Sequence, residues 1–343
     1  MSTENKHPGN SSDSSVIESA ARQLLDQLPP SNASTATKDG YTRELHRLIT
    51  TYKAGSPDQL WAAICATRSK RTYYRRVAAT KHFLRNMVEL ALVQGKTAIL
   101  EFAIRLHEKL LTHSGNCPVT DPKPRHSKRQ DLRGLPEDWR ESMLIALQGG
   151  KFKLPYLVSA VCGCRPEELR TGITVIVNDA SLTLKVRGAK VKATQGQPVR
   201  EITYSIDSSS SNLVRALHSE IAGKDNAHEA SGQITVKIEN KAGFTSALRR
   251  AGRRLWPRRQ SEITPYCLRH AAASDFKEGL SADEVSAALG HSVAETKSLY
   301  GQRQMSQRGG LRPESVRAER SIKPARKVKT LHGGRSPMPK TET

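Results

Sequence analysis

The chain has 343 residues, enough for two domains with additional segments. Its 55 Lys and Arg against 33 Asp and Glu give a net charge of +22, which favours nucleic acid as a partner over a ribosomal, membrane-surface or merely charged-tail interpretation. The sequence excludes a membrane-spanning helix, because no stretch approaches about 20 apolar residues. The first residues also lack the basic-then-apolar order of a signal peptide, so we expect a soluble, cytoplasmic, nucleoid-associated protein with no membrane partner.

The cysteines do not indicate a metal site. There are five, with no CxxC spacing, and Cys162 and Cys164 flank a single glycine. That separation is too short for the usual structural zinc loop, and no histidine cluster completes a site. We therefore expect reduced thiols and no metal.

The first part of the chain changes character near residue 37. Residues 1–36 are rich in Ser, Asn, Asp, Gly and Pro and are predicted to be disordered apart from one short apolar helix. Residues 37–113 carry apolar side chains at steps of three and four without any strand signal, which predicts a helical domain of about four helices.

Basic side chains alternate with aromatic ones in residues 67–85. A basic helix with its apolar face turned inward is suited to a DNA groove or backbone, although a solvated charged face is the alternative. The predicted DNA-binding residues are Arg68, Lys70, Arg71, Arg75, Arg76 and Lys81. The proline-rich, basic residues 114–135 follow without an apolar period and are predicted to be an interdomain linker.

Residues 136–301 form the predicted second domain. Two helices, the second at about 153–162, are followed by strand candidates at 172–177, 181–187 and 199–206. We therefore expect a mostly helical α+β fold with a small three-stranded antiparallel sheet, and an isolated strand at 234–236 remains open. The later helices are expected at 209–222, 241–255, 265–278, 282–289 and 293–300, and 302–343 is expected to be a basic, disordered tail.

Helix boundaries near the end of this domain are well marked. Thr264 and Pro265 predict a helix start. The pairs Ser281 with Glu284 and Ser292 with Glu295 predict two capping boxes. Three successive short helices would thus hold His270, His291 and Tyr300 in defined places.

The chemistry of breaking and rejoining a phosphodiester needs three kinds of group. These are a nucleophile that forms a covalent ester, cations that stabilise the phosphorane, and an acid for the 5′ oxygen. Arginine suits the second role, because its planar fork grips two phosphate oxygens. Tyrosine suits the first if nearby cations favour the phenolate.

The order of residues then resembles a known family. Residues 264–301, with Arg269-His270, Leu-Gly-His291-Ser and Tyr300 nine positions later, resemble the closing motif of the tyrosine recombinase (phage integrase) family. Residues 162–172, with Arg165 and Glu168, resemble its first arginine box. The resemblance covers roughly 136–301 and implies that these residues are a catalytic domain and that residues 37–113 are a core-binding domain.

The resemblance implies roles for these residues. Arg165 and Arg269 would clamp the scissile phosphate, His291 would hydrogen-bond it, and Tyr300 would attack it to leave a 3′-phosphotyrosyl link. Glu168 would support Arg165, and His270 would support the site from the helix behind. The general acid would be Lys190, with Lys192 and Lys185 as alternatives.

Tyr266 is a departure, because the family usually has histidine at that position and tyrosine is a poorer acid–base group near neutral pH. Taken singly, the other residues also have ordinary structural explanations. Arg165 with Glu168 could be a helix-start ion pair, His291 a helix cap and Tyr300 a buried aromatic; only their order favours catalysis.

The resemblance implies a DNA strand transferase that needs no cofactor. Its partners would be double-stranded DNA, three further copies in a tetramer on paired DNA sites, and accessory DNA-bending proteins. A non-cutting DNA-binding protein on the same scaffold, favoured by Tyr266, and a type IB topoisomerase are the alternatives.

Overall fold

The structure is a computed structural model that describes residues 11–112, 117–121, 130–223, 232–294 and 310–324. The chain divides into two compact units, Met1–Arg125 and His126–Thr343. The division falls inside the predicted linker 114–135. Each unit has its own hydrophobic core, so each is described by itself.

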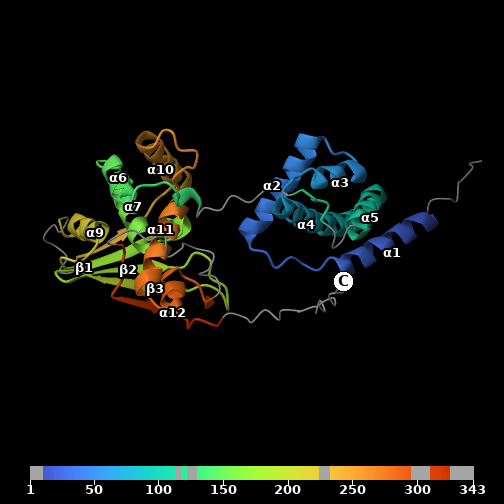
Figure 1. Ribbon diagram of the computed structural model, residues 1–343. Helices are drawn as coiled ribbons and strands as arrows, with labels where there is room; N and C mark the ends of the chain where they lie inside the picture. The colour runs from blue at the N-terminus through green and yellow to red at the C-terminus, as the bar shows by residue number, and fades with distance from the viewer. Residues whose placement is uncertain (1–10, 113–116, 122–129, 224–231, 295–309, 325–343) are drawn as a thin grey trace, which may run out of the picture. The chain divides into compact units, whose positions relative to one another are not determined.

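The N-terminal unit is helical throughout its described residues (Figure 1). Local signals fix the helix ends, since the Ser56 and Ser69 hydroxyls accept backbone hydrogen bonds at two helix starts. Gly95 ends the longest helix in the left-handed conformation. Its helices are α1 (Ser11–Gln27), α2 (Thr35–Tyr52), α3 (Pro57–Cys65), α4 (Lys70–Gln94) and α5 (Thr97–Thr112).

Helix α1 is the short apolar helix that the sequence predicts within residues 1–36. Ala21, Leu24 and Leu28 are buried in the core of the N-terminal unit. The Arg85 side chain of α4 donates to the carbonyls of Leu25, at 3.2 Å, and of Leu28 at the end of α1. The described part of this unit therefore begins with a helix that belongs to its core, ahead of the four helices α2 to α5.

The C-terminal unit combines helices with one antiparallel sheet of order β4-β1-β2-β3-β5 (Figure 1). Its strands are β1 (Ile173–Asn178), β2 (Ser181–Arg187), β3 (Val199–Ser205), β4 (Gly232–Val236) and β5 (Ser315–Ala318). Its helices are α6 (Trp139–Ala146), α7 (Lys153–Cys162), α8 (Pro166–Thr171), α9 (Asn212–Ala222), α10 (Lys241–Leu255), α11 (Pro265–Gly279) and α12 (Ala282–Ala288), with a short 3-10 turn η1 (Gln130–Leu132).

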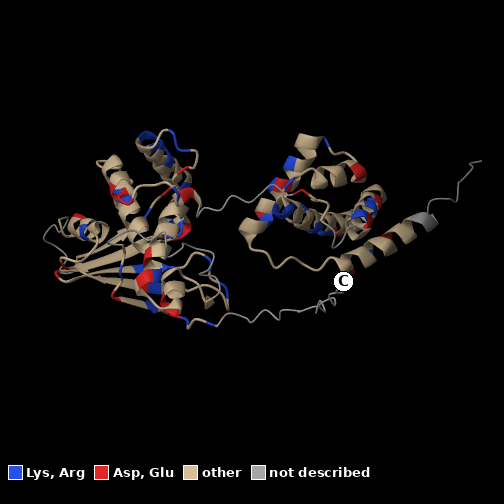
Figure 2. Ribbon diagram, viewed as in Figure 1, with Lys and Arg blue, Asp and Glu red and all other residues tan. Residues whose placement is uncertain are grey.

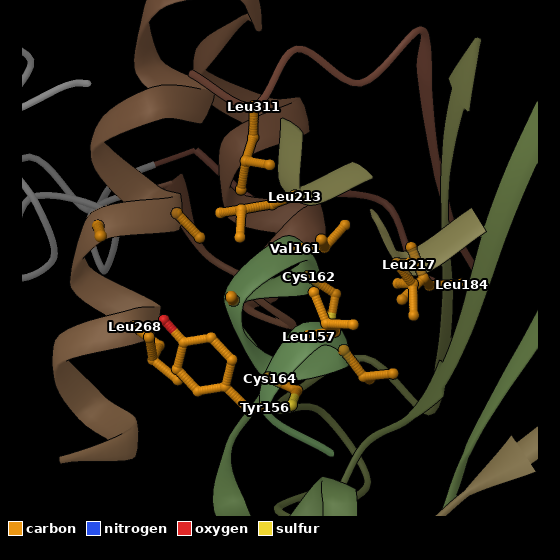
Figure 3. Close-up of a cluster of buried hydrophobic side chains, with 14 of the residues drawn as sticks. Tyr156, Leu157, Val161, Cys162, Cys164, Leu184, Leu213, Leu217, Leu268 and Leu311 are labelled. Atoms are coloured by element: carbon orange, nitrogen blue, oxygen red, sulfur yellow. The ribbon is translucent and has the colours of Figure 1, made fainter. Parts of the chain in front are cut away.

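Helix α7 lies at the centre of this unit, with every residue from Pro155 to Cys162 buried. Figure 3 shows Leu157 and Val161 of α7 in the same buried cluster as leucines of α9, β2 and α11 and as Leu311. The tyrosine hydroxyl of Tyr156 donates to the carbonyl of Arg140 at 2.8 Å, so its polar end is satisfied inside the core. This core fixes the ends of α7 and α11, where the candidate site lies.

The α+β fold class is confirmed, but the sheet has five strands in the described residues and not three. The three predicted strands are present, and the open candidate at 234–236 is the edge strand β4, paired with β1. Strand β5 was missed; it pairs with β3 at the other edge. The prediction that 302–343 is a disordered tail is therefore wrong for 310–324, where Leu311 is fully buried.

The expected helices after the sheet are present as α9 to α12, and the Ser281–Glu284 capping box is formed. The expected helix 293–300 does not begin at Val293, which forms an isolated parallel β-bridge with Lys323. Residues 295–300, with the partner of Ser292 at position 295, lie outside the described residues. None of the helices in the described ranges is long and apolar enough to cross a bilayer. Within the same ranges, His, Cys, Asp and Glu side chains form no group of three that could hold a metal ion.

Candidate active site

The first arginine box lies at a sharp change of direction between α7 and α8. Gly163 ends α7 with φ 59°, where an added Cβ would lie 3.0 Å from the Cβ of Ala272 on α11. Arg165 is the N-cap of α8, and the Glu168 carboxylate accepts from its backbone N–H at 2.8 Å and from its Nη1 at 2.6 Å. Glu168 therefore fixes both the backbone and the side chain of Arg165.

Arg269 joins three elements from its place on α11. Its side chain is fully buried; Nη1 donates to the Gly163 carbonyl at 2.8 Å and Nη2 to the Leu289 carbonyl at 2.6 Å. Nη2 also lies 3.2 Å from Nε2 of His291. Because a guanidinium can only donate, Nε2 accepts here and the neutral imidazole carries its hydrogen on Nδ1.

The turn after α12 brings His291 to the same place. Gly290 has φ 69°, and an added Cβ would lie 2.8 Å from Nη1 of Arg200 and 3.3 Å from Nη1 of Arg165. The His291 backbone N–H donates to the Ser286 carbonyl at 2.8 Å, which fixes the turn. Only glycine fits here, since both the conformation and the guanidinium contacts exclude a side chain.

Arg200 belongs to the cluster although the sequence analysis did not select it. It lies on β3, is fully buried, and donates through Nη2 to Glu168 Oε2 at 2.8 Å and through Nε to the Ala288 carbonyl at 2.7 Å. A signal was available, because Arg200 shares the inward parity of Ile202 and Tyr204 in an alternating strand. A charged residue at an inward position needs a buried partner.

The electrostatics of this cluster are dominated by arginine. Burial alone would raise the pKa of Glu168, but Arg200 first, then Arg165 and Arg269, hold it well below its usual range. Burial, followed by the charges of the same arginines, lowers the pKa of His291 to about 3. These described residues therefore comprise three guanidiniums, one carboxylate and a neutral imidazole, an excess of positive charge suited to an anion.

Access to the cluster is uneven. The Arg165 side chain is 13 % exposed, whereas Arg269 is fully buried and His291 is 6 % exposed. The exposed part of the Arg165 side chain is directly accessible to a ligand. Contact with Arg269 or His291 requires local opening.

The candidate lysines lie on and beside the loop between β2 and β3. Lys190 and Lys192 are exposed within this loop, while Lys185 is inside β2 and forms an ion pair with Glu201 across the strands at 3.1 Å. The loop contacts the His291 turn, because the Gly196 N–H donates to the Ser292 hydroxyl at 3.1 Å. Lys190 and Lys192 thus belong to a loop that reaches the site.

A second link to this loop comes from residues after β5. The Gln197 side chain donates to the carbonyls of His291, at 3.0 Å, and Arg320, at 2.8 Å. The Arg320 guanidinium donates to three loop carbonyls, of which that of Lys192, at 2.8 Å, is nearest. Lys323 adds backbone hydrogen bonds to the stretch that follows His291. Arg320 therefore braces the lysine-bearing loop.

The remaining predicted site residues are distributed as follows. On α11, His270 is buried at 6 % exposure, whereas Tyr266, in the first turn of the same helix, is 39 % exposed. Tyr300 lies outside the described residues, so its place stays a prediction. The described chain resumes at Gly310, and the next backbone N–H, of Leu311, donates to Asp275 on α11 at 3.2 Å.

The predicted DNA-binding residues separate into two groups. Exposed cations on α4 are Lys70, Arg71, Arg75 and Lys81; Arg68, just before α4, is also exposed and pairs with Asp121 at 2.5 Å. Arg76 is different, because it is buried and its Nη1 donates to the carbonyls of Ala63 at 2.8 Å and Ala66 at 3.0 Å. Arg76 therefore holds the end of α3 and is not an available DNA contact.

The C-terminal unit also carries a basic helix. Figure 2 shows blue along α10, which ends with Arg253 and Arg254 in its last turn. Part of this charge is engaged locally, since Glu262 accepts from Arg249 at 2.7 Å and also from Arg253.

The structure is similar to solved structures of site-specific recombinases. XerA recombinase is 16 % identical, with 83 % of this chain and 93 % of that chain covered and a TM-score of 0.34. XerH site-specific recombinase in the pre-cleavage complex with its difH substrate is 14 % identical, with 87 % and 93 % covered and a TM-score of 0.38. Its post-cleavage complex with palindromic difH is 14 % identical, with 83 % and 90 % covered and a TM-score of 0.36. Both proteins are tyrosine recombinases, the group that the sequence motifs resemble. No protein-family model and no curated protein matches the sequence.

Proposed function

We propose that this chain is a site-specific DNA recombinase that cleaves and rejoins DNA through a 3′-phosphotyrosyl intermediate at Tyr300. The observation that carries the proposal is the buried cluster of Arg165, Arg200 and Arg269 around the single carboxylate of Glu168. Preformed donors with an excess of positive charge favour the phosphorane, whose charge exceeds that of the phosphodiester. The ordered motifs that contain Arg165, Arg269, His291 and Tyr300 support the same chemistry.

The reaction exchanges one phosphate ester for another. The Tyr300 oxygen attacks phosphorus, the bond to the 5′ oxygen breaks, the phenolic proton leaves and the 5′ oxygen takes a proton from a general acid. A 5′ hydroxyl from another strand then attacks the phosphotyrosine and releases the tyrosine. Because the intermediate is itself a phosphate ester, the exchange consumes no nucleotide.

Arg165 is the residue best placed to bind phosphate directly, because part of its side chain is exposed. Arg269 and His291 complete the clamp after local opening, with the neutral His291 donating a hydrogen bond from its imidazole N–H. We assign the acid to Lys190 on the β2–β3 loop, with Lys192 as the alternative. Lys185 is disfavoured by its ion pair with Glu201 inside the sheet.

A covalent trapping assay tests this function. The purified chain is incubated with a pool of duplexes of random sequence, each nicked so that the short cleaved fragment bearing the 5′ hydroxyl diffuses away, and adducts that resist denaturant are isolated. Mass spectrometry of the DNA-linked peptide is expected to identify Tyr300, and sequencing of the trapped DNA gives the target site. Tyr300→Phe should abolish the adduct while keeping duplex affinity within a few-fold, since only the nucleophilic oxygen is lost. An adduct on another residue contradicts the assignment.

A non-cutting DNA-binding protein is the second candidate, and Tyr266 favours it. This residue replaces the family's histidine by a poorer proton-transfer group, and its side chain is 39 % exposed. A wild-type chain that binds duplex but forms no adduct, while Tyr266→His does form one, would establish this candidate. Relaxation of a supercoiled plasmid that lacks the trapped site would instead indicate a topoisomerase.

We further propose that the active assembly is a tetramer on two paired DNA sites, because rejoining needs strands from two duplexes. Mass measurement of the complex with trapped-site DNA should give four chains, and one or two chains at saturation would contradict this.

A further inference from the structure

The second buried arginine, Arg200, has three donor contacts that all lead to parts of the candidate site. It donates to both oxygens of Glu168, at 2.8 Å and 3.3 Å, and to the carbonyl of Ala288 at 2.7 Å. Its side chain has no exposed surface. Contact with substrate from this place is excluded unless the unit opens, so any effect of Arg200 passes through its neighbours.

We propose that Arg200 is a positioning residue that neutralises Glu168, leaves the positive charge of Arg165 for the scissile phosphate, and holds the His291 turn against the first arginine box. This inference rests on the proposed recombinase function. It adds Arg200, which lies on β3 outside the sequence motifs, to the residues that those motifs place in the candidate site.

The first step of the argument is the sharing of one carboxylate. Glu168 Oε1 accepts from Arg165 at 2.6 Å and Oε2 accepts from the Arg165 backbone at 2.8 Å, so Glu168 by itself would form a neutral pair with Arg165. The bidentate contact from Arg200 supplies a second cation to the same carboxylate. The trio Arg165, Glu168 and Arg200 therefore carries one net positive charge, and the exposed part of it belongs to Arg165.

The second step is the position of the His291 turn. Arg200 binds the Ala288 carbonyl at the end of α12, and its Nη1 would be 2.8 Å from a Cβ at Gly290. Glycine lets the turn approach the guanidinium, and the backbone carbonyl fixes the approach. Arg200 thus links the elements that carry Arg165 and His291, alongside the contacts of Arg269 to Gly163 and Leu289.

The third step is the cost of burying this group. A buried guanidinium is retained at a large desolvation penalty that its partners must offset. A methionine of similar volume would fill the same space without that cost, so stability alone does not require arginine here. Methionine supplies neither the positive charge nor the directed hydrogen-bond donors of arginine, so these two properties account for arginine at position 200.

The test compares Arg200→Met with the double variant Arg200→Met/Glu168→Gln in full-length chains. Arg200→Met should slow adduct formation on the trapped-site DNA by on the order of a hundredfold, with duplex affinity within about twofold, because Arg200 has no surface to present to DNA. The double variant removes both buried charges, so adduct formation should recover at least tenfold over Arg200→Met. A purely structural role predicts no recovery, and that result would overturn the proposal.

Two further measurements keep the outcomes separate. Arg200→Lys retains the charge and should react faster than Arg200→Met; equal rates would exclude the charge argument even if Arg200→Met folds poorly. Inorganic phosphate titrated into each variant, followed by the ring nitrogen NMR signals of His291, should bind more weakly in Arg200→Met and regain affinity in the double variant. If the wild type forms no adduct, the recombinase function fails, while this titration still decides the role of Arg200.

Discussion

The two units of this chain use the same kind of residue in opposite ways. On α4 of the N-terminal unit, Arg71 and Arg75 are exposed, whereas in the C-terminal unit Arg200 and Arg269 have no exposed side-chain surface. Exposed charges contribute affinity that salt screens and that depends little on their positions. Buried guanidiniums with fixed acceptors are preorganised, and their effect is strong where charge develops.

Arg76 shows that the division does not follow the domain boundary. It belongs to the basic stretch of α4, yet it is 4 % exposed and donates to carbonyls at the end of α3. The comparison therefore concerns burial and partners and not the abundance of arginine. Under the proposed function, exposed cations hold DNA and buried ones act on the phosphate.

The largest expected effect is on the cleavage rate. Arg165→Ala and Arg269→Ala should each slow adduct formation by on the order of a hundredfold or more, the scale for losing one transition-state donor. Arg170→Ala is the matched control, because this exposed arginine lies on α8 and pairs only locally with Glu167 at 2.6 Å. Wild-type rates in either clamp variant, measured by adduct formation, would contradict the assignment.

The next effect is on stability against acid. The pKa of His291 lies at about 3 in the folded chain against 6.5 ordinarily, so between those values the unfolded chain binds a proton that the folded chain does not. The free energy of unfolding should therefore fall by about 2 kcal/mol as the pH drops from 7 to 5. The lowered pKa of Glu168 acts in the same direction, but only below about its ordinary value of 4.5.

Urea unfolding at several pH values measures this, followed by the fluorescence of Trp139 and Trp256 in the C-terminal unit. His291→Gln should flatten the dependence. His107→Gln is the control: burial lowers the pKa of His107 as well, but in the N-terminal unit. A C-terminal transition that changes equally in both variants would show that His291 is not the titrating group.

A smaller effect is expected at Tyr266. Loss of its hydroxyl in Tyr266→Phe should slow adduct formation about tenfold, the value of one neutral hydrogen bond to the phosphate. Tyr266→His should be tolerated and should introduce a pH dependence near the ordinary histidine pKa. An unchanged rate in Tyr266→Phe, measured with saturating DNA, would place its hydroxyl away from the chemistry.

The smallest effects concern the exposed cations. Arg71→Ala and Arg75→Ala should each weaken duplex binding a few-fold and reduce the slope of log affinity against log salt by about one, with an unchanged cleavage rate for bound DNA. Arg47→Ala, which removes an exposed arginine of α2 paired with Glu44 at 2.6 Å, provides the comparison. A reduced cleavage rate in Arg71→Ala at saturating DNA would contradict the view that exposed cations contribute to affinity and not to the cleavage rate.

A test of whether the basic C-terminal residues contact DNA must keep residues up to 324, although the sequence assigned all of 302–343 to a tail. Truncation after residue 310 would remove Leu311 and β5 and would destabilise the C-terminal unit. Truncation after Pro324 keeps both and removes five cations. It should lower the salt slope without changing the cleavage rate if the tail contacts DNA, and an unchanged slope would exclude that contact.

The sequence predicted those parts of the fold that have local signals. Strands β1 to β3 alternate, and α12 begins with a capping box, so both were predicted closely. Strand β5 has only four residues, all at least partly exposed, and it exists because β3 offers a free edge. The local sequence of β5 therefore does not predict a strand, because its strand conformation depends on pairing with β3, which is distant in sequence.

The same limit applies to the candidate site. Arg165, Arg269 and His291 were predicted from ordered motifs, and the structure brings these three together. Arg200 and Gln197 lie in no motif, and their importance follows from Glu168 and His291, which are distant in sequence. Arg76 was assigned to DNA because a basic helix does not reveal which of its cations points inward.

The pairing of β3 with β5 has a consequence for the order of synthesis. Arg200 of β3 pairs with Ala318, and Arg320 braces the lysine-bearing loop. The sheet edge and this loop can therefore be completed only after the ribosome has added roughly 120 residues beyond β3. At about 5–20 residues per second, the ribosome needs on the order of ten seconds for that stretch. A nascent chain can therefore form its arginine-rich core before it can fix its lysines. A chain interrupted before residue 320 would lack the Arg320 contacts that brace the loop carrying Lys190 and Lys192.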